Sequence, residues 1–143
     1  IGNRARVVVT ADHGHLNSPV EARYRVDPRD ELGLMLATPP GADTRVLLCR
    51  PIPGKIHRFV DAFRERFGER FFVLSTDDVE RMELFGPGDL STLTRTRIGE
   101  VVVISAGADS IEYAEKGREL VAKMASVHSG LSVDEMLVPL ILI

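Results

Sequence analysis

Between Val46 and Ile104, short apolar runs alternate with segments of helical periodicity, and this alternation restricts the chain to α/β architectures. The apolar runs predict strands at Val46–Cys49, Phe71–Leu74 and Val101–Ile104. The first intervening segment predicts an amphipathic helix that ends at Gly68, with its apolar face formed by Ile56, Phe59, Val60, Phe63 and Phe67. Asp77 and Glu80 predict the start of a second helix, and Ser91–Ile98 predicts a third.

The two ends of the sequence predict further strands. Ala5–Ala11 is an apolar run that stops at Asp12, and Leu140–Ile143 is apolar enough for a final core strand. Continuous apolar strands are typical of sheets covered on both faces, which are usually parallel, so we expect mostly parallel core strands. Ser132 and Glu135 have the spacing of a capping box, which predicts a short helix ending near Pro139.

The pattern in the middle of the chain predicts a separate unit. We expect residues 43–105 to form an inserted small α/β subdomain, with 1–42 and 106–143 forming the core that carries the polar turns. Outside these units the signals are weaker. Tyr24 and Val26 predict a short exposed strand, Asp30–Ala37 a short helix, and Lys116–Ser126 a loosely helical or irregular segment.

Charge and composition exclude several classes of protein. The net charge of −3 argues against a nucleic-acid footprint, and no apolar run approaches the length of a membrane span, about 20 residues. Cys49 is the single cysteine, which excludes an internal disulfide and favours a reducing compartment such as the cytoplasm. The sequence opens on Ile1 without a signal peptide and almost directly on a strand pattern, so we expect it to be an excerpt from a longer protein.

Two turns contain residues suited to metal binding. Asp12 and His13 follow the first predicted strand, where α/β sheets bind ligands, and carboxylate oxygen and imidazole nitrogen both bind zinc. Gly14 would let the backbone turn sharply and bring both side chains to one point. His128 lies in a second turn of small residues. Taken singly, each turn is more often an ordinary cap or a surface histidine than a metal site.

The remaining candidates are weaker. His15 is either a supporting or extra ligand or a solvated side chain. His57 lies on the charged side of the predicted helix and is expected at the surface, and Cys49 is expected to be inert core. Neither Thr10 nor Ser129 has a partner in sequence that identifies it as a nucleophile, so no catalytic residue is assigned.

Taken together, the two turns resemble a known family. The sequence V-V-V-T-A-D-H-G at 7–14, and H-S-G-L-S-V-D-E-M-L-V-P at 128–139, resemble the alkaline phosphatase superfamily. The greatest likeness is to type I phosphodiesterases and nucleotide pyrophosphatases, including PglZ-like proteins. The related cofactor-independent phosphoglycerate mutases continue D-H-G with Asn, whereas His15 follows here. The matched motifs cover only the two ends of the chain.

The resemblance implies an alkaline-phosphatase-like C-terminal portion of a two-metal phosphoric ester hydrolase. It places Asp12 and His13 on one metal ion and His128 on the second, with zinc as the usual metal. The family's Ser or Thr nucleophile and its remaining ligands lie upstream of D-H-G, so the upstream part of the parent chain is an expected partner and this fragment alone is expected to be inactive. The expected substrate is a small phosphate ester or nucleotide-like molecule.

Two questions stay open at the level of sequence. The chain is either part of an active phosphodiesterase or a non-catalytic binding or regulatory domain that retains the fold. The inserted unit is expected to cap or flank the site, where Arg45, Arg50 or the turn at Ala106–Gly107 would contact the substrate.

Overall fold

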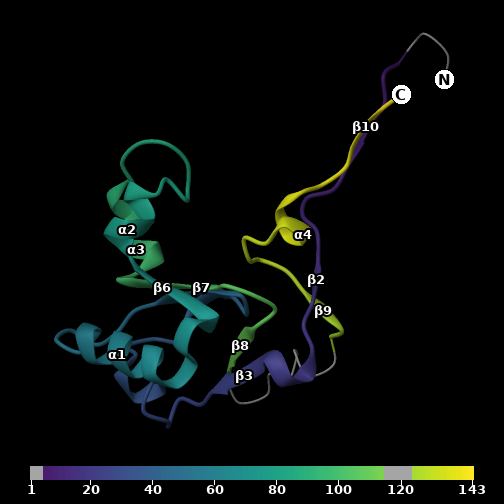
Figure 1. Cartoon of the computed structure of the whole chain (residues 1–143). Helices are drawn as coiled ribbons and strands as arrows, with labels where there is room; N and C mark the ends of the chain where they lie inside the picture. Colours follow the sequence, from purple (N-terminus) through teal and green to yellow (C-terminus); the bar gives the residue numbers. More distant parts are fainter. Residues whose placement is uncertain (1–4, 115–123) are drawn as a thin grey trace.

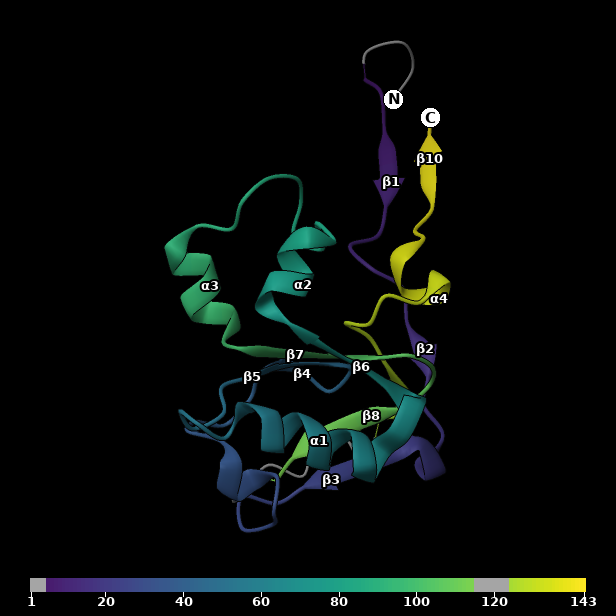
Figure 2. The same cartoon turned by 60° about the vertical axis from the view of Figure 1, so that its left-hand side comes forward.

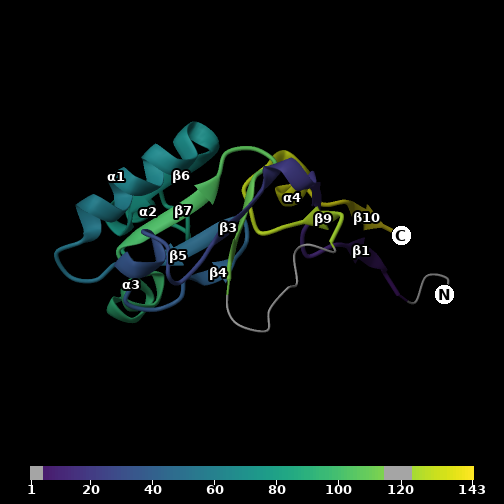
Figure 3. The same cartoon turned by 90° about the horizontal axis from the view of Figure 1, so that it is seen from below.

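The structure is a computed structural model that describes residues 5–114 and 124–143 (Figures 1–3). Its largest sheet has the strand order β4-β5-β7-β6, and every neighbouring pair is antiparallel. These strands are β4 (Gly41–Asp43), β5 (Val46–Cys49), β6 (Phe71–Ser75) and β7 (Val101–Ser105). Since β7 lies between β5 and β6, the unit β5-α1-β6 is a split β-α-β arrangement. The α/β class expected from the alternating pattern is confirmed.

Helices cover both faces of this sheet, as Figure 2 shows. On one face, α1 (Ile56–Phe67) buries Phe59, Phe63 and Phe67 to 1–2% exposure against the sheet. On the other, α2 (Thr76–Arg81) and α3 (Thr92–Ile98) contribute Val79 and Ile98 to a second apolar cluster. The central strand β7 is therefore buried at all five positions.

The helix starts follow local signals. The apolar positions predicted for the first helix are the buried face of α1, and Ser91 caps α3 by accepting a hydrogen bond from the Thr94 amide. The predicted start at Asp77 is wrong by two residues. Ser75 caps α2 and forms a capping box with Asp78, because the serine hydroxyl and the Asp78 carboxylate satisfy each other's backbone amides.

The described residues form three further pairings of two strands each. Of these, β1 with β10 and β2 with β9 are antiparallel, whereas β3 with β8 is parallel. The strands are β1 (Val8–Thr10), β2 (Leu16–Asn17), β3 (Arg23–Val26), β8 (Ser110–Tyr113), β9 (Ser126–Val127) and β10 (Leu140–Leu142). The expectation of mostly parallel core strands is therefore wrong for the pairings among the described residues. Continuous apolar runs reflect burial on both faces, which helices give to the antiparallel sheet here.

The first and last strands form an arm that extends from the rest of the fold (Figures 1 and 2). We call this ribbon, formed by β1 and β10, the β1/β10 arm. Both strands are exposed along their length, with Val8 at 57% and Leu142 at 71% exposure. The expected core strand at the C-terminal end is thus exposed in this structure, because each strand of the arm has only the other as its ladder partner among the described residues.

The weaker predictions had mixed outcomes. The short strand around Tyr24 is β3, but its Val26 is buried rather than exposed. The helix expected over Asp30–Ala37 is only one 3₁₀ turn, η3 (Gly33–Met35). Most of the segment from Lys116 to Ser126 lies outside the described residues.

Two further 3₁₀ turns, η2 and η4, span Val20–Ala22 and Gly68–Arg70. A short helix, α4, spans Val133–Met136 and has the predicted capping box.

The predicted boundary of the inserted unit has a structural counterpart, since the four-stranded sheet is built from residues 41–105. The division of the chain into a core and an inserted subdomain remains a prediction. Within the described ranges, no helix is long and apolar enough to cross a bilayer.

Candidate functional site

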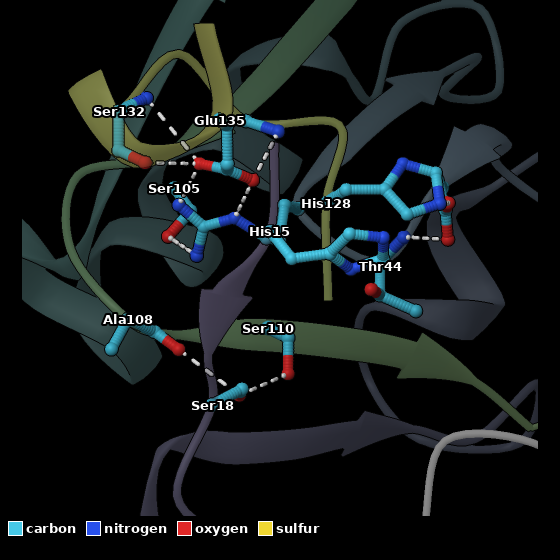
Figure 4. Close-up of polar contacts among 12 residues, drawn as sticks. His15, Ser18, Thr44, Ser105, Ala108, Ser110, His128, Ser132 and Glu135 are labelled. Carbon is cyan, nitrogen blue, oxygen red and sulfur yellow. Dashed lines mark hydrogen bonds and ion pairs between the residues drawn. The ribbon is translucent and has the colours of Figure 1, made fainter. Parts of the chain in front are cut away.

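The two histidine-containing turns lie against each other. His13 follows β1, His128 follows β9, and their rings stack with centroids 4.1 Å apart and planes 18° from parallel. The ring of His15 completes a cluster, 5.2 Å from each of the other two. The pairing of Leu16 with Val127 between β2 and β9 explains this arrangement, because it sets His15 and His128 side by side (Figure 4).

Hydrogen bonding fixes the orientation of His13. Its Nδ1 lies 2.9 Å from the Gly14 carbonyl oxygen, which can only accept, so Nδ1 carries the proton and donates. The other nitrogen, Nε2, is therefore unprotonated in the neutral ring and lies 3.6 Å from Oδ2 of Asp12. An imidazole whose Nδ1 is held by a carbonyl presents Nε2 for metal coordination.

Asp12 is held in its ionised form. Its carboxylate is 87% exposed and accepts a hydrogen bond from the His13 amide at 3.0 Å. Hydrogen bonds from the backbone amides of Asp12 and His13 lower the pKa of this carboxyl. A negatively charged oxygen therefore lies beside Nε2 of His13 at neutral pH.

His128 has an acidic neighbour that the sequence did not indicate. Its Nε2 lies 4.0 Å from Oδ2 of Asp43, the last residue of β4, and both side chains are partly exposed. Asp43 is distant in sequence from both motifs, so only the fold brings it here. His128 is thus between a carboxylate and the ring of His13.

The donor set fits divalent metal chemistry of the kind zinc requires. A zinc ion binds imidazole nitrogen and carboxylate oxygen at about 2.0–2.2 Å, so a separation of 3.6 Å between Asp12 and His13 suits one shared ion. Among residues 5–114 and 124–143 there is no group of three or more such side chains placed to hold a single ion.

Gly14 joins the first turn to α4. Its amide donates to the Glu135 carbonyl oxygen at 2.8 Å, and an added Cβ would lie 1.9 Å from the backbone oxygen of Asp134. Gly14 is therefore required for close approach of two backbones, whereas the sequence suggested a sharp turn. It is absent from the described glycines with a positive φ.

A buried ion pair supports the second turn. The guanidinium of Arg45 donates twice to the Glu135 carboxylate, from Nε at 2.6 Å and from Nη2 at 2.8 Å, and both side chains are 1% exposed. Its remaining nitrogen, Nη1, donates to Ser105 and to the carbonyls of Gly107 and Asp109. Every nitrogen of Arg45 thus has an acceptor, which a buried cation needs to offset the loss of hydration.

Glu135 connects this pair to the turn of His128. Its carboxylate also accepts from the Gly130 amide at 2.8 Å and from the Ser132 hydroxyl at 2.6 Å (Figure 4). Burial alone would raise the pKa of Glu135, but the hydrogen bonds from Arg45, Ser132 and Gly130 outweigh it and lower the pKa to about 2. The segment after His128 is therefore held by an ionised carboxylate that is paired with Arg45, in the turn between β4 and β5.

These contacts correct one expectation and support others. Arg45 is buried and fully paired, so it has no free group for a substrate, and Arg50 donates to the Thr96 carbonyl oxygen. His57 is exposed, as expected. Cys49 is 1% exposed and burial raises the pKa of its thiol to about 12, which agrees with inert core.

The fold has counterparts among solved structures. Human ectonucleotide pyrophosphatase / phosphodiesterase 5 aligns with 96% of the chain at a TM-score of 0.70 and 15% identity. The murine protein aligns with 96% at 0.66 and 15% identity. Phosphonoacetate hydrolase from Sinorhizobium meliloti, solved with phosphonoacetate, aligns with 97% at 0.62 and 20% identity. The chain shares their fold.

The alkaline phosphatase-like fold expected from the two motifs is therefore confirmed. The chain spans about a third of the length of these solved proteins, from 33% to 36%. No protein-family model and no curated protein matches the sequence. The comparison establishes the architecture, whereas the roles of individual residues depend on the contacts described above.

Proposed function

We propose that this chain is the part of a two-metal phosphoric ester hydrolase, of the phosphodiesterase or nucleotide pyrophosphatase type, that carries ligands for both metal ions. Asp12 and His13 would hold one ion and His128 the other. The observation that supports this most is the stacking of His13 on His128 at 4.1 Å, because the two turns come from opposite ends of the chain. The shared fold with two kinds of hydrolase supports the same reaction class.

Each residue has a task that its contacts suit. Asp12 supplies a carboxylate that is ionised at neutral pH, and His13 is oriented by its hydrogen bond to the Gly14 carbonyl. Glu135 and Arg45 hold the turn that presents His128. Divalent metal ions bound by these side chains would polarise a phosphoryl group and stabilise negative charge on the attacking and leaving oxygens.

A nucleophile and further ligands would come from other parts of the same protein. The chain spans about a third of the solved hydrolases, which leaves room for such elements. The exposed apolar side chains of the β1/β10 arm suit packing against more of the same protein, because soluble proteins seldom leave paired apolar strands in water.

The test is a joint measurement of metal content and hydrolysis in the natural full-length protein. After saturation with zinc, we expect hydrolysis of bis(p-nitrophenyl) phosphate or p-nitrophenyl phosphate. His128→Ala should lower bound zinc by one ion per chain and reduce hydrolysis at least about a hundredfold. His57→Ala is the matched control, since His57 is exposed on α1 and should change neither value.

The possible outcomes separate the two functional hypotheses. Zinc binding that requires His128 without hydrolysis of any ester would favour the non-catalytic binding domain. Zinc content unaffected by Asp12→Ala and His128→Ala would contradict the assignment of these residues as ligands.

A further inference from the structure

An apolar cavity lies beside the candidate metal site. It has a volume of about 390 Å³, within the range of small-molecule pockets. Its floor is the face of the four-stranded sheet that carries Leu48, Val102 and Ile104. Phe85, from the loop after α2, and Leu131, from the turn after His128, also line the cavity.

The cavity and the histidine cluster share a boundary. Asp43 lines the cavity, and its Oδ2 is 4.0 Å from Nε2 of His128. Ser129 also lines the cavity and directly follows His128 in sequence. A ligand with its phosphoryl group at the histidines can therefore place the attached organic group in this space.

Ser129 has two features that suit a ligand contact. Its backbone has φ of 85°, a left-handed conformation that is uncommon for a residue with a side chain. Within the described part of the chain, its Oγ is the one buried side-chain polar atom without a hydrogen-bond partner. Strained backbone and an unsatisfied polar atom together are characteristic of functional sites.

The lining determines what the cavity can accept. Its walls are almost entirely aliphatic or aromatic, which favours an uncharged apolar group, and the carboxylate of Asp43 at the rim disfavours a second anionic group. The unpaired hydroxyl of Ser129 favours a group that also carries one hydrogen-bonding atom.

We propose that this cavity binds the aromatic group of the phosphate ester, with Ser129 Oγ donating a hydrogen bond to a ring heteroatom. The chain would thereby prefer esters that bear a flat aromatic group over esters with a small alkyl group. This proposal rests on the proposed function, because it assigns the phosphoryl end of the ligand to the histidine cluster.

Ligand binding to the zinc-loaded full-length protein, measured by calorimetry, tests the proposal. The probes are 1-naphthylphosphonate and methylphosphonate, which share a headgroup and differ in the aromatic ring. We expect the naphthyl compound to bind at least about tenfold more tightly, because its ring is removed from water. Phe85→Ala and Leu131→Ala should each reduce that ratio by about threefold or more.

Matched controls exclude a general effect of losing an exposed apolar side chain. Phe72→Ala and Leu93→Ala remove side chains that are 58% and 61% exposed and outside the cavity lining, against 55% for Phe85 and 50% for Leu131. These controls should leave the ratio of the two phosphonate affinities unchanged. An affinity ratio near one in the natural protein, or equal effects of the cavity-lining and control substitutions, would overturn the proposal.

The hydrogen bond from Ser129 is tested separately. Ser129→Ala should weaken binding of 8-quinolinylphosphonate, whose ring nitrogen accepts a hydrogen bond, by about threefold or more and leave 1-naphthylphosphonate unaffected. Equal losses for both compounds would overturn the role of Ser129.

A fourth probe, 1-naphthol, separates this proposal from the proposed function because it has no phosphoryl group. Naphthol binding that Phe85→Ala weakens, together with no metal-dependent phosphonate binding, would support the cavity and contradict the hydrolase assignment. Metal-dependent binding of both phosphonates with equal affinity would support metal binding at the histidines and contradict the role of the cavity.

Discussion

Two glycines of the candidate site lie where a single methyl group has no room. A Cβ on Gly14 would lie 1.9 Å from the Asp134 carbonyl oxygen, and one on Gly130 would lie 2.7 Å from the Arg45 guanidinium and the Glu135 carboxylate. Both glycines belong to the two motifs seen in the sequence. Their presence is therefore explained by packing between the turns as well as by any chemistry of the adjacent histidines.

We expect Gly14→Ala to lower the free energy of unfolding by at least about 2 kcal/mol, because the obstructing atom is backbone and cannot rotate away. Urea denaturation followed by circular dichroism measures this. The control is Gly41→Ala, whose added Cβ would make only an ordinary contact of 3.6 Å with Leu48, so its effect should stay within about 0.5 kcal/mol. Similar losses in both variants would contradict the packing argument.

At the scale of single elements, local patterns predicted several helices and strands correctly and misplaced others. The strand β5 and the helix α1 follow from apolar spacing, and the box of Ser132 and Glu135 starts α4 as expected. The start of α2 was predicted at the wrong residue although the sequence contains the correct capping box. Ser75 and Asp78 have the same spacing as Asp77 and Glu80, the pair from which the start was predicted. Strand direction was not predictable, because it depends on which distant strand becomes the neighbour.

The helix α1 allows a direct test of the core. Phe63 is 1% exposed and contacts the rings of Phe59, Phe67 and Phe71. Phe63→Ala should lower the free energy of unfolding by about 4 kcal/mol, because it leaves a cavity in a closed aromatic cluster. His57→Ala on the exposed face of α1 should change it by less than about 0.5 kcal/mol. Chemical denaturation of both variants is the measurement, and a small loss for Phe63→Ala would show that the cluster is not part of the stabilising core.

At the scale of the whole molecule, the site combines predicted and unpredicted parts. The sequence indicated Asp12, His13 and His128, and the structure places their turns together. It did not indicate Asp43, nor the pairing of Arg45 with Glu135 across the molecule. Those contacts depend on how the unit of residues 41–105 packs beside the two turns, and no local pattern contains that information.

The ion pair of Arg45 and Glu135 predicts sensitivity to acid. The pKa of Glu135 is lowered from 4.5 to about 2 in the folded chain. Its contribution to the free energy of unfolding is therefore complete above pH 4.5 and is lost as the pH falls toward 2. The loss should be on the order of 3 kcal/mol. Between pH 4.5 and 2, the melting temperature should fall more steeply with decreasing pH for the natural chain than for Glu135→Gln.

At neutral pH the Glu135→Gln variant should be less stable than the natural chain. Acid should lower its stability by a smaller amount, because the Gln side chain does not titrate. The carboxyls of Asp12, Asp30 and Asp78 also have lowered pKa values and will contribute equally in both proteins. Parallel curves for the two proteins would contradict the assignment to Glu135.

The contacts that complete the site join residues far apart in the chain. Arg45 and Glu135 are 90 positions apart, and His15 and Ser126 are 111 positions apart. Closing such long loops is slow, whereas β5, α1 and β6 follow one another closely along the chain. During synthesis, all four strands of the sheet at residues 41–105 are present before His128 is added. The histidine cluster cannot form until His128 has been added, so release of the chain before that residue leaves the candidate site without one of its three histidines.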